Sequence, residues 1–377
     1  MRIVLTHPFC WPYVRRGTER NMDGLARYLT TRGHDVITVS TKPGRGVVEE
    51  TDAGRRIIYP QRWIPLMGKL RIQPGHPFFL QSLRAVRRLQ ADIVHSWWFT
   101  DSLAASLTRG CGHRTVLQLN GAPIPAAYYR RFPPDRWIIR EAIARADRVV
   151  ACSRFVSGLV EQHYGVTPGV MIPPVDMDLF GLGRGPRDGR PTILAVGDFD
   201  VRRKGVRVLV RAFVRVHEKV PTARLVLSGR MSPEVRTDVL TGLPADVAAS
   251  VDILGLGRPE DLPGLYGAAS VMVLPSMWEA AGLVMFEAWA AGTPVVAVAH
   301  GGPPEFMADG VGMLFEPGTD GEETHNAEGL AEAILGGLAL AEREGTRERC
   351  RAHAERYSWS TLGPGIEDMY RELRSRG

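Results

Sequence analysis

The sequence predicts an α/β protein built from two doubly wound domains. Strand-like and helix-like segments alternate in both halves of the chain, which is typical of parallel sheets covered by helices. The stretch at 181–191 is rich in glycine and proline and predicts a linker between the halves. At 377 residues, the chain is long enough for two domains that each bury a core. We therefore predict one domain at 1–180 and another at 192–358.

Short apolar runs mark the strands of the first half, and longer segments between some of them mark helices. The predicted strands are Ile3–Thr6, Asp35–Ser40, Ile93–Ser96, Thr115–Leu119 and Val149–Cys152. The predicted helices are Asn21–Arg32, Gln81–Leu89 and Asp135–Ala146.

The second half repeats this rhythm and ends in a helical stretch around Ile366–Leu373. Its predicted strands are Thr192–Val196, Arg224–Ser228, Val251–Leu254, Val271–Leu274 and Val295–Val298.

Composition indicates an ordinary soluble protein, with 44% hydrophobic and 23% charged residues. The N-terminus reads as a first strand and is too short for a signal peptide, and no apolar run approaches the roughly 20 residues of a spanning helix. We expect a cytoplasmic location. No Cys-x-x-Cys motif occurs, so we expect buried free thiols rather than a zinc site or disulfides. The cysteines are Cys10, Cys111, Cys152 and Cys350.

Charge is distributed unevenly along the chain. Residues 1–185 carry 26 basic and 14 acidic residues, a net charge of +12, whereas residues 186–377 carry 21 and 27, a net charge of −6. A basic N-terminal half suits an anionic acceptor or a peripheral contact with the inner membrane face. Only four of the 47 basic residues are lysines, so a compositional preference for arginine is the alternative explanation.

Two carboxylates stand out in the second half. The apolar run Val271–Leu274 leads into a loop with Glu279, Gly282 then opens a helix that carries Glu287, and Gly292 ends that helix. A carboxylate at a strand's C-terminal end, beside the free N–H groups of a helix start, makes a site for anions and hydroxyls. A nucleotide diphosphate sugar needs both kinds of partner.

The run from Pro275 to Ala297 resembles the signature of the retaining glycosyltransferases of family four (group 1), which have the GT-B fold. The resemblance covers nearly the whole chain and implies two Rossmann-like domains facing across a cleft, with a helix at 359–377 that crosses back to the first domain. The other matching segments are Arg32–Val36, Ile172–Asp176, Leu194–Gly197, Lys204-Gly205, His300–Glu305 and Gly312–Pro317.

The resemblance also implies roles for residues of the second half. Glu287 resembles the ribose ligand, Glu279 faces the transferred sugar, and Lys204 binds phosphate. The helix start at Gly282, Leu283 and Val284 would offer its amides to the donor. The chain departs from the family in two places. Ala280-Ala281-Gly282 replaces the commoner Gly-Phe-Gly, and Asp198 stands where an arginine is usual, so we expect Arg202 or Arg203 to replace that arginine.

In the first half, Gly17-Thr18 resembles the glycine loop that passes close to donor phosphate and acceptor. Asn120 stands where many relatives have a histidine; its amide can hydrogen-bond a sugar hydroxyl but cannot titrate. His95 matches another family position, with a structural role as the alternative. The tryptophans Trp97 and Trp98 suit either sugar stacking or core packing.

The combined reading is a retaining hexosyltransferase that moves a sugar from a UDP- or GDP-sugar to a hydroxyl of a small-molecule, glycan or lipid-linked acceptor. We expect no metal, no further cofactor and no nucleic-acid partner. A non-catalytic sugar-binding protein and a GT-B epimerase remain alternatives. The residues assigned to catalysis are Glu279, Lys204, Asn120 and His95, and those assigned to donor binding are Gly17, Thr18, Arg203, Lys204, Gly282, Leu283, Val284 and Glu287.

Overall fold

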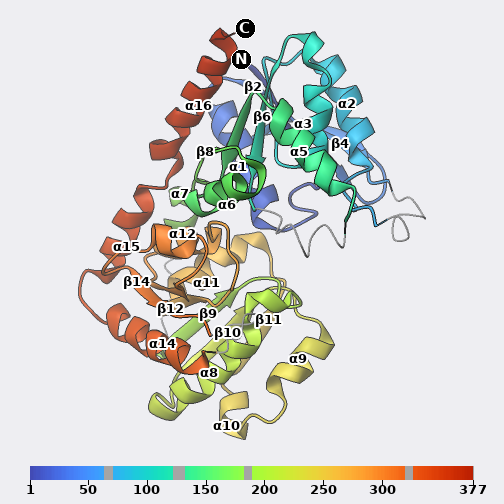
Figure 1. The fold of residues 1–377 in the computed structure, drawn as a ribbon. Coiled ribbons are helices and arrows are strands. Elements are labelled where there is room, and N and C mark those ends of the chain that lie inside the picture. The colour runs from blue at the N-terminus through green and yellow to red at the C-terminus, as the bar shows by residue number, and fades with distance from the viewer. Residues whose placement is uncertain (63–70, 122–131, 182–188, 319–325, 377) are drawn as a thin grey trace. The chain divides into compact units, whose positions relative to one another are not determined.

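The computed structural model describes residues 1–62, 71–121, 132–181, 189–318 and 326–376. The chain divides into two compact units (Figure 1). Unit 1 comprises Met1–Pro173 and Leu362–Gly377, and unit 2 comprises Pro174–Thr361. Each unit is built on its own sheet flanked by helices, which confirms the predicted fold class. Most of the linker predicted at 181–191 lies outside the described residues.

The sheet of unit 2 is parallel, with the strand order β11-β10-β9-β12-β13-β14. The strands are β9 (Thr192–Val196), β10 (Arg224–Ser228), β11 (Val251–Gly255), β12 (Val271–Leu274), β13 (Val295–Val298) and β14 (Gly312–Phe315). The order reverses between β9 and β12, the neighbours at the centre of the sheet. In open parallel sheets, ligands bind beyond the carboxyl ends of the strands at such a reversal.

Burial explains why the strands β12 and β13 were predicted correctly, whereas β14 was not predicted and is only partly buried. Every residue of β12 and β13 is buried, as expected for strands covered by helices on both faces. Helix α8 buries Leu209, Phe213 and Val216, one stripe at helical spacing, in the core beneath the sheet. The helices of unit 2 are α7 (Met177–Gly181), α8 (Val206–Lys219), α9 (Pro233–Leu240), α10 (Ala245–Ala248), α11 (Leu262–Ala268), α12 (Leu283–Ala290), α13 (Pro303–Phe306), α14 (Ala327–Ala341) and α15 (Thr346–Glu355).

The sheet of unit 1 has the order β3-β4-β2-β1-β5-β6-β7-β8 and reverses between β1 and β5. All neighbours are parallel except the β3–β4 hairpin at one edge. The strands are β1 (Arg2–Thr6), β2 (Asp35–Lys42), β3 (Val47–Thr51), β4 (Gly54–Pro60), β5 (Ile93–Ser96), β6 (Arg114–Leu119), β7 (Arg148–Ala151) and β8 (Gly169–Val170). The sequence did not predict β3, β4 or β8, because these strands, at or next to the edges of the sheet, are only partly buried or exposed.

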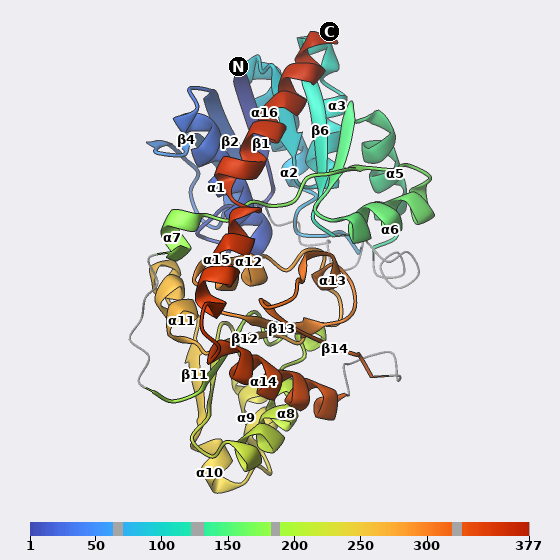
Figure 2. The same ribbon diagram turned by 90° about the vertical axis from the view of Figure 1, so that its left-hand side faces the viewer.

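Helices cover both faces of the unit 1 sheet. Helices α1 and α16 lie on one face, and α2, α3 and α5 lie on the other (Figures 1 and 2). These helices and α6 are bounded as follows: α1 (Gly17–Thr31), α2 (Phe78–Leu89), α3 (Phe99–Ser106), α5 (Asp135–Arg145), α6 (Arg154–Tyr164) and α16 (Trp359–Ser375). No helix among the described residues has the length and apolar content needed to cross a membrane.

All four cysteines are free thiols. Cys10, Cys152 and Cys350 are buried, as predicted. Cys111 is exposed, so the prediction was wrong for this residue; it ends a short 3₁₀ turn at the surface, Arg109–Cys111.

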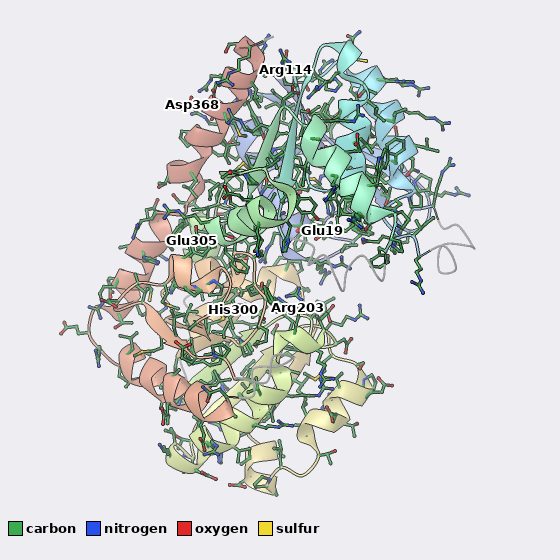
Figure 3. The ribbon with its side chains drawn as sticks, in the orientation of Figure 1. Glu19, Arg114, Arg203, His300, Glu305 and Asp368 are labelled. Atoms are coloured by element: carbon green, nitrogen blue, oxygen red, sulfur yellow. The ribbon has the colours of Figure 1, made fainter. Side chains whose placement is uncertain are left out.

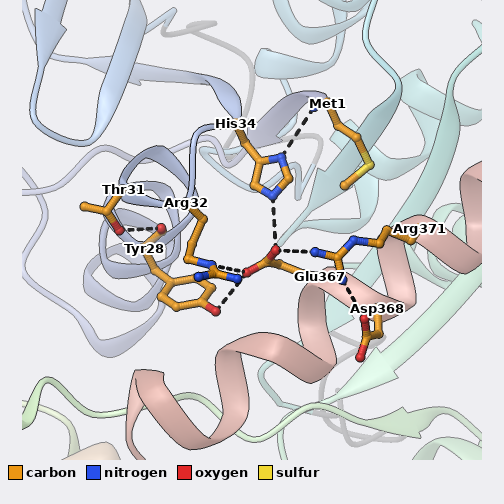
Figure 4. Close-up of polar contacts among 8 residues, drawn as sticks. All are labelled: Met1, Tyr28, Thr31, Arg32, His34, Glu367, Asp368 and Arg371. Carbon is orange, nitrogen blue, oxygen red and sulfur yellow. Dashed lines mark hydrogen bonds and ion pairs between the residues drawn. The ribbon is translucent and has the colours of Figure 1, made fainter.

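The C-terminal helix α16 is bound to unit 1 through one buried carboxylate, Glu367 (Figure 4). Its oxygens accept hydrogen bonds from the Tyr28 hydroxyl at 2.9 Å, Arg32 Nε at 2.8 Å and Arg371 at 2.7 Å, while His34 Nε2 lies at 3.4 Å. Burial alone would raise the pKa of Glu367, but the bonds from Arg32, Tyr28 and His34 outweigh it and lower the pKa. Glu367 is therefore a charged anchor between α16 and α1.

Gly363 provides a test of this docking. A Cβ on Gly363 would lie 2.3 Å from Cζ of Tyr28, whereas a Cβ on Gly365, two residues further along α16, meets nothing within 4 Å. We expect Gly363→Ala to lower the free energy of unfolding by about 1–3 kcal/mol through overpacking. Gly365→Ala should raise it by about 0.5–1 kcal/mol, because alanine favours the helix. Urea unfolding measures the free energy of unfolding of both variants. Equal values would contradict the close packing of α16 at Gly363 against Tyr28.

Candidate active site

Three loops meet at the C-terminal edge of the unit 2 sheet. They follow β9, β12 and β13, and comprise residues 197–205, 275–282 and 299–302. The first two follow the strands between which the order reverses. This edge is therefore where the topology places a ligand.

Glycines let the backbones of these loops pass closer than any side chain allows. A Cβ on Gly205, whose φ is +69°, would lie 2.5 Å from the carbonyl oxygen of Pro275. A Cβ on Gly302 would lie 2.2 Å from the carbonyl oxygen of Ala280. The loop after β12 is thus held between its two neighbours by main-chain packing.

Glu279 and Lys204 form an ion pair across the first two loops. Lys204 Nζ donates to Oε1 of Glu279, and the Arg203 guanidinium lies 4.0 Å from the same oxygen while donating to the Trp278 carbonyl at 2.6 Å. Burial alone would raise the pKa of Glu279, but the charge and hydrogen bond of Lys204, with help from Arg203 and the Ser276 hydroxyl, lower it. Glu279 is therefore ionised at neutral pH. The loop after β9 also places Arg203 near this carboxylate.

The third loop supports Glu279 from the other side. A Cβ on Gly301 would lie 2.8 Å from the carbonyl oxygen of Glu279, and the amide of Gly302 donates to that oxygen at 2.8 Å. The ring of His300 packs edge-on against Trp278 with centroids 4.8 Å apart. Figure 3 labels Arg203 and His300 on this part of unit 2.

Glu287 lies inside unit 2 on helix α12 and is only 3% exposed. The hydroxyl of Tyr266, from α11, donates to its Oε2 at 2.8 Å. The predicted helix start is confirmed, because α12 begins at Leu283 and Gly282 precedes it with φ +77°. Tyr266 was missed by the sequence analysis. It lies 21 residues before its partner and belongs to no motif quoted from the chain.

The start of α12 adds positive character to the same edge. Leu283 and Val284 are its first residues, so their amides have no carbonyl one turn earlier within the helix. Helix starts attract anions. The amides of Leu283 and Val284, together with the side chains of Lys204 and Arg203, form a site that suits a phosphate group. Among the residues that the structure describes, no cluster of three or more His, Cys, Asp or Glu side chains is arranged to hold a metal ion.

In unit 1 the structure brings Thr18 and Asn120 together, although 102 residues separate them. Asn120 Nδ2 donates to Thr18 Oγ1 at 3.3 Å, and Gln118 Nε2 donates to Asn120 Oδ1 at 3.0 Å. Gly17 and Thr18 form the first turn of α1 instead of the loop that was expected. The helix starts four residues before the predicted Asn21, with the acid Glu19 in its first turn, where an acid complements the helix dipole.

His95 lies in the interior of unit 1, next to Gln118, the residue that donates to Asn120. It is fully buried, its Nδ1 is 2.6 Å from the Tyr370 hydroxyl of α16, and its ring stacks on Trp97 with centroids 4.0 Å apart. Burial lowers its pKa to about 3. These contacts hold His95 and Trp97 in the core of unit 1.

The sequence analysis did not identify two titratable groups, His7 directly after β1 and Glu19 in the first turn of α1. His7 and Glu19 are both buried, with Nδ1 and Oε1 3.9 Å apart (Glu19 is labelled in Figure 3). Burial lowers the pKa of His7 to about 4 and raises that of Glu19. The sequence could have pointed to Glu19, because it directly follows the Gly17-Thr18 segment that resembles the family's glycine loop.

Comparison with known families is consistent with this architecture. A family model described as "Glycosyltransferase Family 4" matches residues 15–178, and one described as "Glycosyl transferases group 1" matches residues 190–339. The fold and the two family models together define a GT-B glycosyltransferase. The chain carries a glycosyltransferase family 4 domain followed by a glycosyltransferase group 1 domain.

Individual relatives agree with this class. The chain is 29% identical to a D-inositol 3-phosphate glycosyltransferase of Corynebacterium jeikeium over 94% of this chain and 91% of the relative. Among solved structures, it resembles sucrose-phosphate synthase from Thermosynechococcus elongatus with a TM-score of 0.80 and 22% identity, covering 100% of both chains. It also resembles Anabaena HepE in complex with UDP-glucose, with a TM-score of 0.75 and 18% identity over 99% of this chain and 100% of that chain.

The buried histidines predict how stability depends on pH. His7 and His95 have folded-state pKa values of about 4 and about 3, below the ordinary value of about 6.5, so the unfolded chain binds more protons between these limits. Stability is therefore lost as pH falls from about 6.5 to about 4 because of His7, and down to about 3 because of His95. His95→Gln should remove about 1–3 kcal/mol of this loss. Urea unfolding at several pH values measures it; identical slopes for the variant and the parent protein would contradict the burial of a neutral His95.

Proposed function

We propose that this protein transfers a sugar from a nucleotide diphosphate sugar to an acceptor hydroxyl, with retention of the anomeric configuration. The observation that carries the proposal is the ionised Glu279 held by Lys204, with Arg203 beside it, where the strand order of unit 2 reverses. The site thus combines cations for a diphosphate with a carboxylate for sugar hydroxyls. Buried Glu287 lies on the helix that starts at the same edge.

The donor is assigned to these groups by their chemistry. The diphosphate would be held by Lys204, Arg203 and the amides of Leu283 and Val284, because cations and helix starts both bind phosphate. Glu287 would accept hydrogen bonds from the ribose hydroxyls, as acids do in dinucleotide sites. UDP-glucose, the ligand named for Anabaena HepE, is the first donor to test.

The ionisation state of Glu279 limits its role. With a lowered pKa, it accepts hydrogen bonds from sugar hydroxyls and does not serve as a proton donor. In the proposed reaction, the bond between the anomeric carbon and the diphosphate breaks as the acceptor oxygen attacks on the same face. The acceptor proton passes to the leaving phosphate oxygen. Lys204 and Arg203 stabilise the negative charge that develops there, which is electrostatic preorganisation.

The acceptor is assigned to unit 1. Thr18 and Asn120 are joined by a hydrogen bond at the start of α1, and their remaining hydrogen-bonding capacity suits a hydroxyl-rich molecule. The relatives named D-inositol 3-phosphate glycosyltransferases make a phosphorylated polyol the first acceptor to test.

Release of nucleotide diphosphate on mixing with candidate donors and acceptors tests the function. Proton NMR of the new glycosidic linkage then reports its configuration. An inverted anomer would contradict retention. Donor binding without any release, across a broad acceptor panel, would favour a non-catalytic sugar-binding protein, and interconversion of the donor itself would favour an epimerase.

Glu287→Gln should weaken binding of UDP, because the neutral amide loses a charged hydrogen bond to ribose worth roughly 1.5–3 kcal/mol. Isothermal titration calorimetry measures the affinity. Glu332→Gln is the matched control, since Glu332 is an exposed glutamate on α14 of the same unit. Tyr266→Phe is a second variant, because it removes one hydrogen-bond donor to Glu287 and leaves the carboxylate in place. Equal UDP affinity in Glu287→Gln and the control would remove Glu287 from the donor site.

Turnover should persist in excess EDTA, because Lys204, Arg203 and the helix amides supply the positive charge that the leaving diphosphate needs. Initial rates with and without the chelator are compared at saturating donor. A loss of turnover that Mg²⁺ or Mn²⁺ restores would show that a metal supplies this charge instead.

A further inference from the structure

Helices α2 and α5 of unit 1 carry arginines with no acidic partner. On α2 these are Arg84, Arg87 and Arg88, and on α5 they are Arg136 and Arg140. All five are exposed, and none forms a side-chain hydrogen bond or ion pair with another residue that the structure describes. Other exposed arginines of the unit do find acids, such as Arg2 with Asp35 at 2.6 Å.

The acidic groups of these two helices do not offset this charge. Helix α2 contains no aspartate or glutamate. On α5, Asp135 is fully buried and accepts a hydrogen bond from Gln73 at 2.5 Å, while Glu141 is paired with Arg145 at 2.7 Å. The five arginines therefore present uncompensated positive charge to solvent.

Each of the two helices also exposes one large apolar side chain. Trp137 on α5 is 62% exposed, the highest value for a large hydrophobic residue in the described part of the chain. Leu80 on α2 is 53% exposed, and at helical spacing it shares a face with Arg84, Arg87 and Arg88. The opposite face of α2 is buried.

Helices α2 and α5 lie on the same side of unit 1 (Figures 1 and 2). Helix α3 packs against both and is buried throughout its length. Figures 1 and 2 show α2, α3 and α5 on the same face of the unit 1 sheet. We call the five arginines together with Leu80 and Trp137 the α2–α5 face.

We propose that the α2–α5 face docks unit 1 on an anionic lipid surface. Arginines near such a surface are attracted by its negative potential and pair with lipid phosphates. Tryptophan is favoured at the level of the headgroups, where an apolar ring with a polar N–H meets both environments. A compositional preference for arginine explains how many arginines the chain has, but it does not explain why this face lacks free acids and exposes Trp137.

Nucleic acid is also polyanionic and is the rival partner. Its phosphate backbone attracts arginine equally, and Trp137 could stack on a base. It offers no apolar layer for Leu80, whereas a lipid interface does. The pairing of Leu80 and Trp137 with the arginines therefore favours the membrane.

Co-sedimentation of the full chain with vesicles tests the proposal. Binding should rise with the fraction of phosphatidylglycerol in phosphatidylcholine vesicles and fall with salt, since exposed charges are screened over about 8–10 Å at physiological ionic strength. The triple variant Arg84→Gln/Arg87→Gln/Arg88→Gln should bind roughly a hundredfold more weakly, at about fivefold per arginine. Trp137→Ala should weaken the binding that survives at high salt.

The matched control removes the same charge from unit 2. Arg211, Arg236 and Arg343 are exposed there and have no partner among the described residues, so Arg211→Gln/Arg236→Gln/Arg343→Gln should bind vesicles like the parent protein. Equal binding by the two triple variants, or binding that ignores phosphatidylglycerol, would overturn the proposal. So would tight binding of a labelled RNA oligonucleotide through the same arginines without vesicle binding. Sugar transfer is not a readout here, so the outcome is independent of the proposed function.

Discussion

The close approach of three backbones at the edge of the unit 2 sheet is the constraint on which the site depends. The loop after β12 passes so near its neighbours that Gly205 and Gly302 have no room for a side chain. This packing leaves Glu279 little freedom, and the carboxylate meets Lys204 from the neighbouring loop. Because both partners are positioned by main chain and not by flexible side chains alone, their charges are arranged before any ligand arrives.

The partners of the glutamates explain how unit 2 can hold carboxylates that are largely shielded from solvent. A buried carboxylate without a partner would take up a proton, whereas Glu279 is paired with Lys204. Glu287 lies deeper in the unit, where the Tyr266 hydroxyl donates a hydrogen bond to it.

The sequence was informative where structure is local. The strands β12 and β13, the glycine before α12 and the position of Glu287 in that helix all follow from one contiguous stretch. Contacts between distant segments were not accessible in this way. Tyr266 with Glu287, and Thr18 with Asn120, are hydrogen bonds that only the tertiary fold creates. For His95 the sequence left a structural role open as the alternative, and only the tertiary structure shows its ring in contact with Trp97 and Tyr370.

The anchoring of α16 through Glu367 has a consequence for how the protein is made. Tyr28 and Arg32 leave the ribosome early, but their partner on α16 follows more than 330 residues later. Chain growth of roughly 5–20 residues per second separates the two events by many seconds. During that interval, unit 1 lacks the segment that contacts Tyr28 and His95, and all of unit 2 up to Thr361 is synthesised before that segment follows. Unit 1 is thus begun before unit 2 but completed after it, and a nascent chain exposes this unfinished face of unit 1 until α16 emerges.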